Sequence, residues 1–220
     1  VTDEDARKLY DADPQAFTLP EQCEVSYVSI PIADFTDDQA EIADEDIQDY
    51  YELHIEDYTT KETDTNGTPR ETVADLDAVK PEIVKALRHQ AAGEKADEAA
   101  TELAMRAIPD KDGVVPDFAE VAKTAGREAR KLPPFSRQDL PVKDGGAAFA
   151  AAAFALEPGA YDRVSDPVAG DDHVYVIYLE KKIEPRVPDF AEAKDEVLAT
   201  ARRQALTEAL SAKALAVKKA

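Results

Sequence analysis

The sequence has no tryptophan, one cysteine, one methionine and only 7% aromatic residues. The single cysteine, Cys23, excludes a disulfide within the chain. Its place in an apolar, alternating run predicts a buried small side chain rather than a reactive thiol. No apolar run approaches the roughly twenty residues of a membrane-spanning helix, and no signal peptide is present. The sequence therefore contains neither an intrachain disulfide nor a candidate transmembrane helix.

Basic residues are also scarce. The sequence has 26 Lys and Arg against 47 Asp and Glu, which gives a formal net charge of −21. Phosphate backbones and anionic membrane surfaces would repel such a chain, so we expect no nucleic acid and no membrane contact. The acidity favours solubility, and an acidic face for basic unfolded polypeptides is the alternative interpretation. The chain opens at Val1 without an initiator Met, which indicates a fragment of a longer protein.

The first sixty residues contain a weak internal repeat, in which residues 2–18 match residues 43–59 at a constant offset of 41. Each copy predicts a short helix with an acidic first turn, which opposes the helix dipole favourably, followed by a turn and an aromatic residue. Thr2 can cap the first helix, whereas Ala43 cannot cap the second. Between the copies, residues 24–32 alternate and are rich in β-branched side chains, which predicts a strand.

The polar residues 60–72 predict a loop or linker, since they include Asn66-Gly67 and Pro69. Residues 76–107 predict an alanine-rich helix, with a break near Gly93 left open. An apolar helix is expected at 147–156, and strands at 161–167 and 173–179. The sum is an α+β fold with a small antiparallel sheet and helices before, between and after the strands.

The string Val-Pro-Asp-Phe-Ala-Glu occurs at residues 115–120 and again at 187–192. We interpret both copies as helix starts, with Asp117 and Asp189 as N-caps and Glu120 and Glu192 as their reciprocal partners. The second start opens one long helix that runs towards the C-terminus.

Residues 116–123 (PDFAEVAK) and 149–185 resemble the PpiC-type, or parvulin, domain of peptidyl-prolyl isomerases. Its marks are a Phe-x4-Phe-x-Leu helix, a Pro-Gly break, a short strand, and a glycine-bearing turn before a His-led final strand. Residues 1–32 and 42–59 resemble the matching regions of PpiD and SurA-type periplasmic folding factors. In those proteins, helices from both termini form a chaperone lobe around the parvulin units.

The resemblance implies a parvulin-like domain made of residues 21–35 and 111–185, split by a helical insert. The remaining segments, 1–20, 36–110 and 186–220, would form a helical chaperone-like lobe. It further implies a periplasmic folding factor that binds unfolded or proline-containing polypeptides. Whether a segment upstream of Val1 anchors the full-length protein in the inner membrane stays open.

The resemblance also assigns the site. The family's two histidines correspond to Tyr27, on the first strand, and His173, at the start of the last strand, and a Tyr27–His173 hydrogen bond could imitate their pair in part. Leu140 lies near the position of a methionine that lines the family's proline pocket. Because a tyrosine stands in place of one histidine, we predict weak or absent isomerase activity.

Three phenylalanines complete the implied substrate site: Phe149 or Phe154 as the aromatic of the proline pocket, and Phe135 as a further wall. Isomerisation must cross an amide rotation barrier of about 18–20 kcal/mol and needs no nucleophile. A water-poor apolar pocket that favours the twisted amide can supply the acceleration. The same three side chains fit an ordinary core equally well.

Two other functions stay open, an active proline isomerase and a non-catalytic adaptor that docks a folded partner through the C-terminal helix. The three histidines, His54, His89 and His173, have no metal-ligand spacing, so we expect neither a metal nor a cofactor.

Overall fold

The computed structural model describes residues 2–63 and 69–219. Helices and strands alternate irregularly along the chain, and the predicted α+β class is confirmed. The elements are α1 (Asp3–Ala12), η1 (Pro14–Phe17), β1 (Gln22–Pro31), η2 (Ile32–Phe35), α2 (Asp44–Leu53), β2 (Thr59–Thr63), β3 (Pro69–Val73), α3 (Leu76–Ala107), α4 (Phe118–Thr124), β4 (Ala129–Ser136), α5 (Gly146–Ala155), β5 (Val168–Ala169), β6 (His173–Ile183) and α6 (Phe190–Lys219).

The main sheet is antiparallel and has the strand order β4-β1-β6-β5, so β1 pairs with strands that follow it by about a hundred residues or more. The strand predicted at 24–32 is confirmed as β1, and the strand predicted from His173 is confirmed as β6. The strand predicted at 161–167 is wrong. That run makes a single bridge, from Val164 to Tyr178, and the short strand β5 begins only after Pro167, which has no N–H to donate.

Both faces of this sheet are covered, which explains why neighbouring residues of β1 and β6 are buried alike. One face packs against α5 through Val25 and Ile177, and the other packs against α3 and α4 through Val28 and Val176. The sheet is therefore the centre of two hydrophobic clusters rather than the wall of one.

Helix α3 is continuous for 32 residues, so it has no break at Gly93. Its second half covers the sheet, although the predicted division placed all of residues 36–110 in the helical lobe. Four alanines at helical spacing allow this close approach: Ala92, Ala96, Ala100 and Ala107 are buried in the cluster on that side, together with Leu103.

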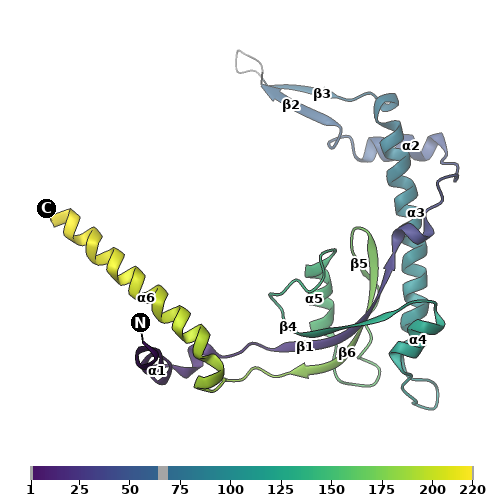
Figure 1. Cartoon of the computed structure of the whole chain (residues 1–220). Helices are drawn as coiled ribbons and strands as arrows, with labels where there is room; N and C mark the ends of the chain where they lie inside the picture. Colours follow the sequence, from purple (N-terminus) through teal and green to yellow (C-terminus); the bar gives the residue numbers. More distant parts are fainter. Residues whose placement is uncertain (1, 64–68, 220) are drawn as a thin grey trace.

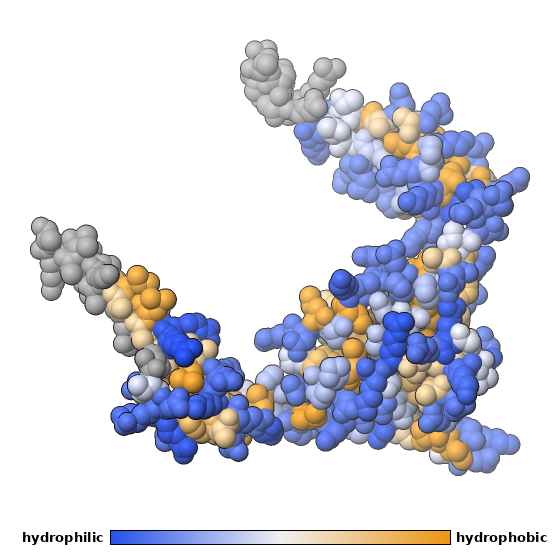
Figure 2. All heavy atoms as spheres, viewed as in Figure 1, coloured by the Kyte–Doolittle hydropathy of each residue, from blue (hydrophilic) through white to orange (hydrophobic). Residues whose placement is uncertain are grey.

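The two copies of the internal repeat take equivalent positions. Helix α1 packs on the long helix α6, and α2 packs on the long helix α3; Ala6 and Ile47, which match in the repeat, are buried in the two copies. Figure 1 shows these pairs at opposite ends of the sheet, with the hairpin β2–β3 beside α2. In the space-filling view of Figure 2 the molecule is open between the two ends.

The loop predicted for residues 60–72 is wrong at both ends, where β2 and β3 pair as a hairpin; its Asn66-Gly67 lies outside the described residues. Polar strands of this kind carry no alternating apolar signal, and one of their cross-strand contacts is an ion pair between Lys61 and Glu71 at 3.4 Å. Within the described ranges, none of the helices is long and apolar enough to cross a membrane.

Helix starts follow the sequence signals in part. Thr2 forms a complete capping box with Asp5, and Ala43 makes no side-chain cap. Asp117 and Asp189 accept hydrogen bonds from the N–H groups three residues on, at 3.0 and 2.9 Å, so both predicted N-caps are confirmed. The predicted reciprocal roles of Glu192 and Glu120 are not confirmed. Glu192 pairs with Arg186 at 2.5 Å, and Glu120 lies 3.5 Å from Lys123.

Candidate functional site

An acidic side chain, Asp144, holds the turn that leads into β6. Its oxygens accept hydrogen bonds from the N–H groups of Asp171 (2.5 Å) and Asp172 (3.1 Å), and one oxygen lies 3.0 Å from Nδ1 of His173. Because an ionised carboxylate only accepts, Nδ1 carries the proton and Nε2 is left to meet a ligand. Burial opposes ionisation of Asp144, but the three hydrogen bonds outweigh it, and the net effect lowers its pKa.

Two glycines let this contact form. A Cβ atom on Gly170 would lie 2.5 Å from Oδ1 of Asp144, closer than any side chain could tolerate. Gly145 has a φ of 65°, in the left-handed region, and its own Cβ would lie 3.0 Å from the Cα of Gly170. Asp144 had no signal in the sequence beyond its place before Gly145-Gly146, and sequence reasoning missed it.

The sheet register decides how the predicted catalytic residues lie. Tyr27 is opposite Ile177 on β6, whereas His173 is opposite Pro31, four residues further along β1. At about 3.3 Å per residue this places the two side chains roughly 13 Å apart along the strand. Both residues are described by the structure and no hydrogen bond joins them, so the direct Tyr27–His173 bond suggested by the sequence does not form.

Tyr175 fills the space between them. Its ring centroid lies 6.1 Å from that of Tyr27 and 6.0 Å from that of His173, on the sheet face covered by α5. Burial, helped by the nearby charge of Asp144, raises the pKa of Tyr175 to about 12, and a hydrogen bond with Ser29 offsets part of the rise. The phenol is therefore neutral at physiological pH. Strand alternation from His173 is the signal that could have identified it.

The three predicted phenylalanines are brought together, but as a closed cluster. Phe149 is 0% exposed, and its ring meets Tyr27 and Tyr175 edge-on, with centroids 5.4 and 5.5 Å apart. Phe135 contacts both Phe149 and Phe154 and is itself buried. This geometry is that of core packing.

Leu140, the fourth predicted substrate residue, is apart from this cluster. It is 69% exposed and packs only over the start of α5, where a Cβ on Gly146 would lie 3.3 Å from its own Cβ. It lies outside the buried cluster that contains the three phenylalanines, so the four side chains do not form a common pocket.

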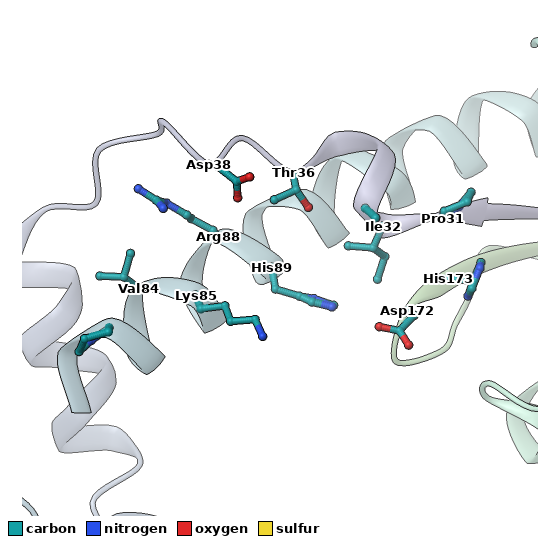
Figure 3. Close-up of a pocket in the computed structure, with 12 residues that line it drawn as sticks. Pro31, Ile32, Thr36, Asp38, Val84, Lys85, Arg88, His89, Asp172 and His173 are labelled. Atoms are coloured by element: carbon teal, nitrogen blue, oxygen red, sulfur yellow. The ribbon is translucent and has the colours of Figure 1, made fainter. Parts of the chain in front are cut away.

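An open cavity of about 420 Å³ lies on the other side of His173 (Figure 3). Helix α3 forms one wall with Val84, Lys85 and His89, and the nitrogen-bearing ends of Lys85 and His89 point across the space towards Asp172. Its lining is Pro31, Ile32, Ala33, Thr36, Asp38, Pro81, Val84, Lys85, Arg88, His89, Asp172 and His173.

The α3 wall of this cavity carries the cations Lys85 and Arg88, and Arg88 also fixes the neighbouring segment in place. Arg88 donates from Nε and Nη2 to the carbonyl oxygen of Ala40, at 3.2 and 2.8 Å, which ties the segment after η2 to α3. No group of His, Cys, Asp and Glu in the described part of the chain is arranged to hold a metal ion.

The sheet order, the buried helix α5 and the histidine at the head of β6 can now be compared with known proteins. The family model of the PPIC-type PPIase domain matches residues 42–195. This chain belongs to the PpiC-type peptidyl-prolyl isomerase domain family. The match begins after β1, so the central strand of the sheet lies outside it.

Curated proteins and solved structures were also compared with this chain. No curated protein matches this chain. Among solved structures, a match comes from work on the virulence factor PEB4 and the periplasmic protein Cj1289, two structurally related SurA-like chaperones of Campylobacter jejuni. That match has 16% sequence identity and a TM-score of 0.33, and covers 99% of this chain but only 61% of the other.

Proposed function

We propose that this chain is a periplasmic, chaperone-like folding factor that binds unfolded or proline-containing segments beside His173 and has weak or no isomerase activity. One observation carries the proposal: Tyr175 closes the aromatic cluster between Tyr27 and His173, while the cavity on the other side of His173 is open. The periplasmic location rests on the resemblance of residues 1–32 and 42–59 to PpiD and SurA-type factors.

We expect weak catalysis because a proline ring has little access to the aromatic cluster and because the nearby polar side chains differ from those of the family. A proline ring that reached Phe149 would have to displace Tyr27 or Tyr175, and moving the buried ring of Tyr175 into water would cost about 1.5–3 kcal/mol. Tyr175 keeps its proton up to about pH 12, and Nδ1 of His173 is held by Asp144. The site therefore lacks both an open proline pocket and the paired histidines of the family.

Peptide binding is favoured by the lining of the open cavity. Pro31, Ile32 and Val84 offer apolar surface, and Lys85 and Asp172 offer a donor and an acceptor to a peptide backbone. Cavities of this size, mostly apolar with a few polar groups, are typical ligand sites. A segment bound here would lie across the head of β6, against His173.

The proposal is tested with a fluorescein-labelled, proline-containing peptide, followed by anisotropy, and with a client whose aggregation is monitored by light scattering. We expect Val84→Asp, which puts a charge on the apolar wall, to weaken peptide binding about tenfold or more. The matched control is Met105→Asp on the same helix, because Met105 is 69% exposed and lines none of the described cavities. Equal affinities for the two variants, or no suppression of aggregation by the wild type, would reject the proposal.

A further inference from the structure

A second cavity, of about 530 Å³, lies between α2 and the neighbouring face of α3. We call it the α2–α3 groove. Apolar side chains form part of its lining, and one of them, Leu53, is 80% exposed to solvent. The lining consists of Ile42, Asp46, Asp49, Tyr50, Leu53, Leu87, Gln90, Ala91 and Glu94.

The groove carries negative charge without a cation. Asp46, Asp49 and Glu94 line it, no Lys or Arg does, and none of the three has an ion-pair partner within residues 2–63 and 69–219. Asp44, one residue outside the lining, is by contrast paired with Lys80 at 2.7 Å. Residues 34–57 together contain eleven Asp and Glu and no Lys or Arg.

The exposed apolar surface and the unpaired carboxylates together indicate which kind of peptide the groove would bind. Exposed apolar surface favours a large aliphatic or aromatic side chain. Unpaired carboxylates around it favour a cation, and they disfavour an acidic segment by like-charge repulsion. Lys and Arg satisfy both demands, because their stems pack on apolar surface while their charged ends reach the rim.

We infer that the α2–α3 groove binds segments of unfolded polypeptide in which Lys or Arg alternates with large apolar residues. The inference rests on the proposed function and deepens it by naming a class of client. The groove is separate from the cavity at His173, since Arg88 and His89 face that cavity and Leu87 and Ala91 face the groove. The two sites also differ in charge. The α3 wall of the cavity at His173 carries cations, whereas the α2–α3 groove is lined by acidic residues.

The test uses a fluorescein-labelled peptide of alternating Lys and Leu, and a second peptide in which Gln replaces Lys. We expect the double variant Asp46→Asn/Asp49→Asn to bind the Lys-Leu peptide about tenfold more weakly than the wild type, since each exposed ion pair contributes up to about fivefold. The matched control is Glu41→Gln/Glu45→Gln, which changes the net charge equally at exposed residues outside the groove. Its affinity should stay within about twofold of the wild type.

Three further measurements decide the inference. The wild type should bind the Lys-Leu peptide more tightly than the Gln-Leu peptide, and the difference should shrink as salt rises. Leu53→Ser should weaken binding of the Lys-Leu peptide with little effect on folding, because Leu53 is so exposed. Equal losses in the two double variants would mean attraction to the net charge alone and would overturn the inference.

The proline-containing peptide separates this inference from the proposed function. If that peptide binds, is weakened by Val84→Asp and is unaffected by Asp46→Asn/Asp49→Asn, both sites act as described. If it fails to bind while the Lys-Leu peptide binds the groove, the proposal for the cavity at His173 fails and the groove stands. If it binds and the two double variants do not differ, only the groove is rejected.

Discussion

Replacing Asp144 by Asn tests whether one carboxylate organises the turn at the head of β6. The carboxylate accepts from two backbone N–H groups and from His173, and its side chain is only 16% exposed. In the variant, one carbonyl oxygen remains for three donors, and the new NH₂ group faces donors rather than acceptors.

The expected loss is about 3 kcal/mol of unfolding free energy, since a hydrogen bond to a charged group contributes about 1.5–3 kcal/mol and part of the network survives. For a chain of this size, that corresponds to a fall in Tm of roughly 6–12 °C. Gly170→Ala should cost a similar amount, because its Cβ would occupy the position of the Asp144 carboxylate. The double variant should lose less than the sum, since both changes break the same contact.

The contribution of Asp144 to the free energy of unfolding should depend on pH. The pKa of Asp144 is lower in the folded chain than its ordinary value, near 4 in an unfolded one. Its contribution is therefore fully present above about pH 4 and is lost as the pH falls through the folded pKa. The gap between wild type and Asp144→Asn should be constant from about pH 5 to 8 and should narrow in acid.

Urea unfolding followed by circular dichroism and by tyrosine fluorescence measures these quantities. The control is Asp166→Asn, because Asp166 is exposed and makes no hydrogen bond within the described residues. A loss below about 0.5 kcal/mol for Asp144→Asn, or the same loss at pH 3 as at pH 7, would show that the ionised carboxylate does not hold this turn.

Three other buried side chains, Phe149, Tyr175 and Cys23, can each be tested by substitution, titration or labelling. Phe149→Ala should cost about 3–5 kcal/mol of unfolding free energy, whereas Leu140→Ala should cost less than about 0.5 kcal/mol; equal costs by urea titration would contradict the placement of the two side chains. Because the folded pKa of Tyr175, about 12, exceeds the ordinary value near 10, its contribution is present below pH 10 and lost as the pH rises through about 12. Tyr175→Phe should lack that alkaline loss when both chains are titrated with urea. Burial raises the pKa of Cys23 to about 11, so a thiol reagent near neutral pH should label it only when the chain unfolds; rapid labelling of the native protein would disprove its burial.

Local signals were sufficient for most of the elements. The alternation around Val25 and Val28 predicted β1, and repeated acidic starts predicted α1 and α2. The alanine spacing predicted α3 but not its packing, because a stripe of alanines fits a sheet and another helix equally well. The hairpin β2–β3 was missed since its strands are polar and carry no period-two apolar pattern.

The site was harder to predict, because it depends on register and on contacts distant in sequence. His173 and Tyr27 were identified on the correct strands, yet only the pairing of β1 with β6 places Tyr175 between them. Asp144 lies 29 residues before His173, in a segment without periodicity, and only the folded turn brings them together. Phe149 and Leu140 look alike as apolar residues in sequence, but one is fully buried and the other is exposed.

Cis–trans exchange of a short proline peptide that the wild-type protein binds tests whether a closed aromatic cluster lies beside an open peptide cavity. Uncatalysed exchange takes tens to hundreds of seconds, so acceleration is easily measured by nuclear magnetic resonance. We predict binding at the cavity, sensitive to Val84→Asp, with at most about a twofold increase in the exchange rate. Rapid turnover at catalytic protein concentrations, abolished by Phe149→Ala in a variant that remains folded, would show that the aromatic cluster admits substrate and that the domain is an active isomerase.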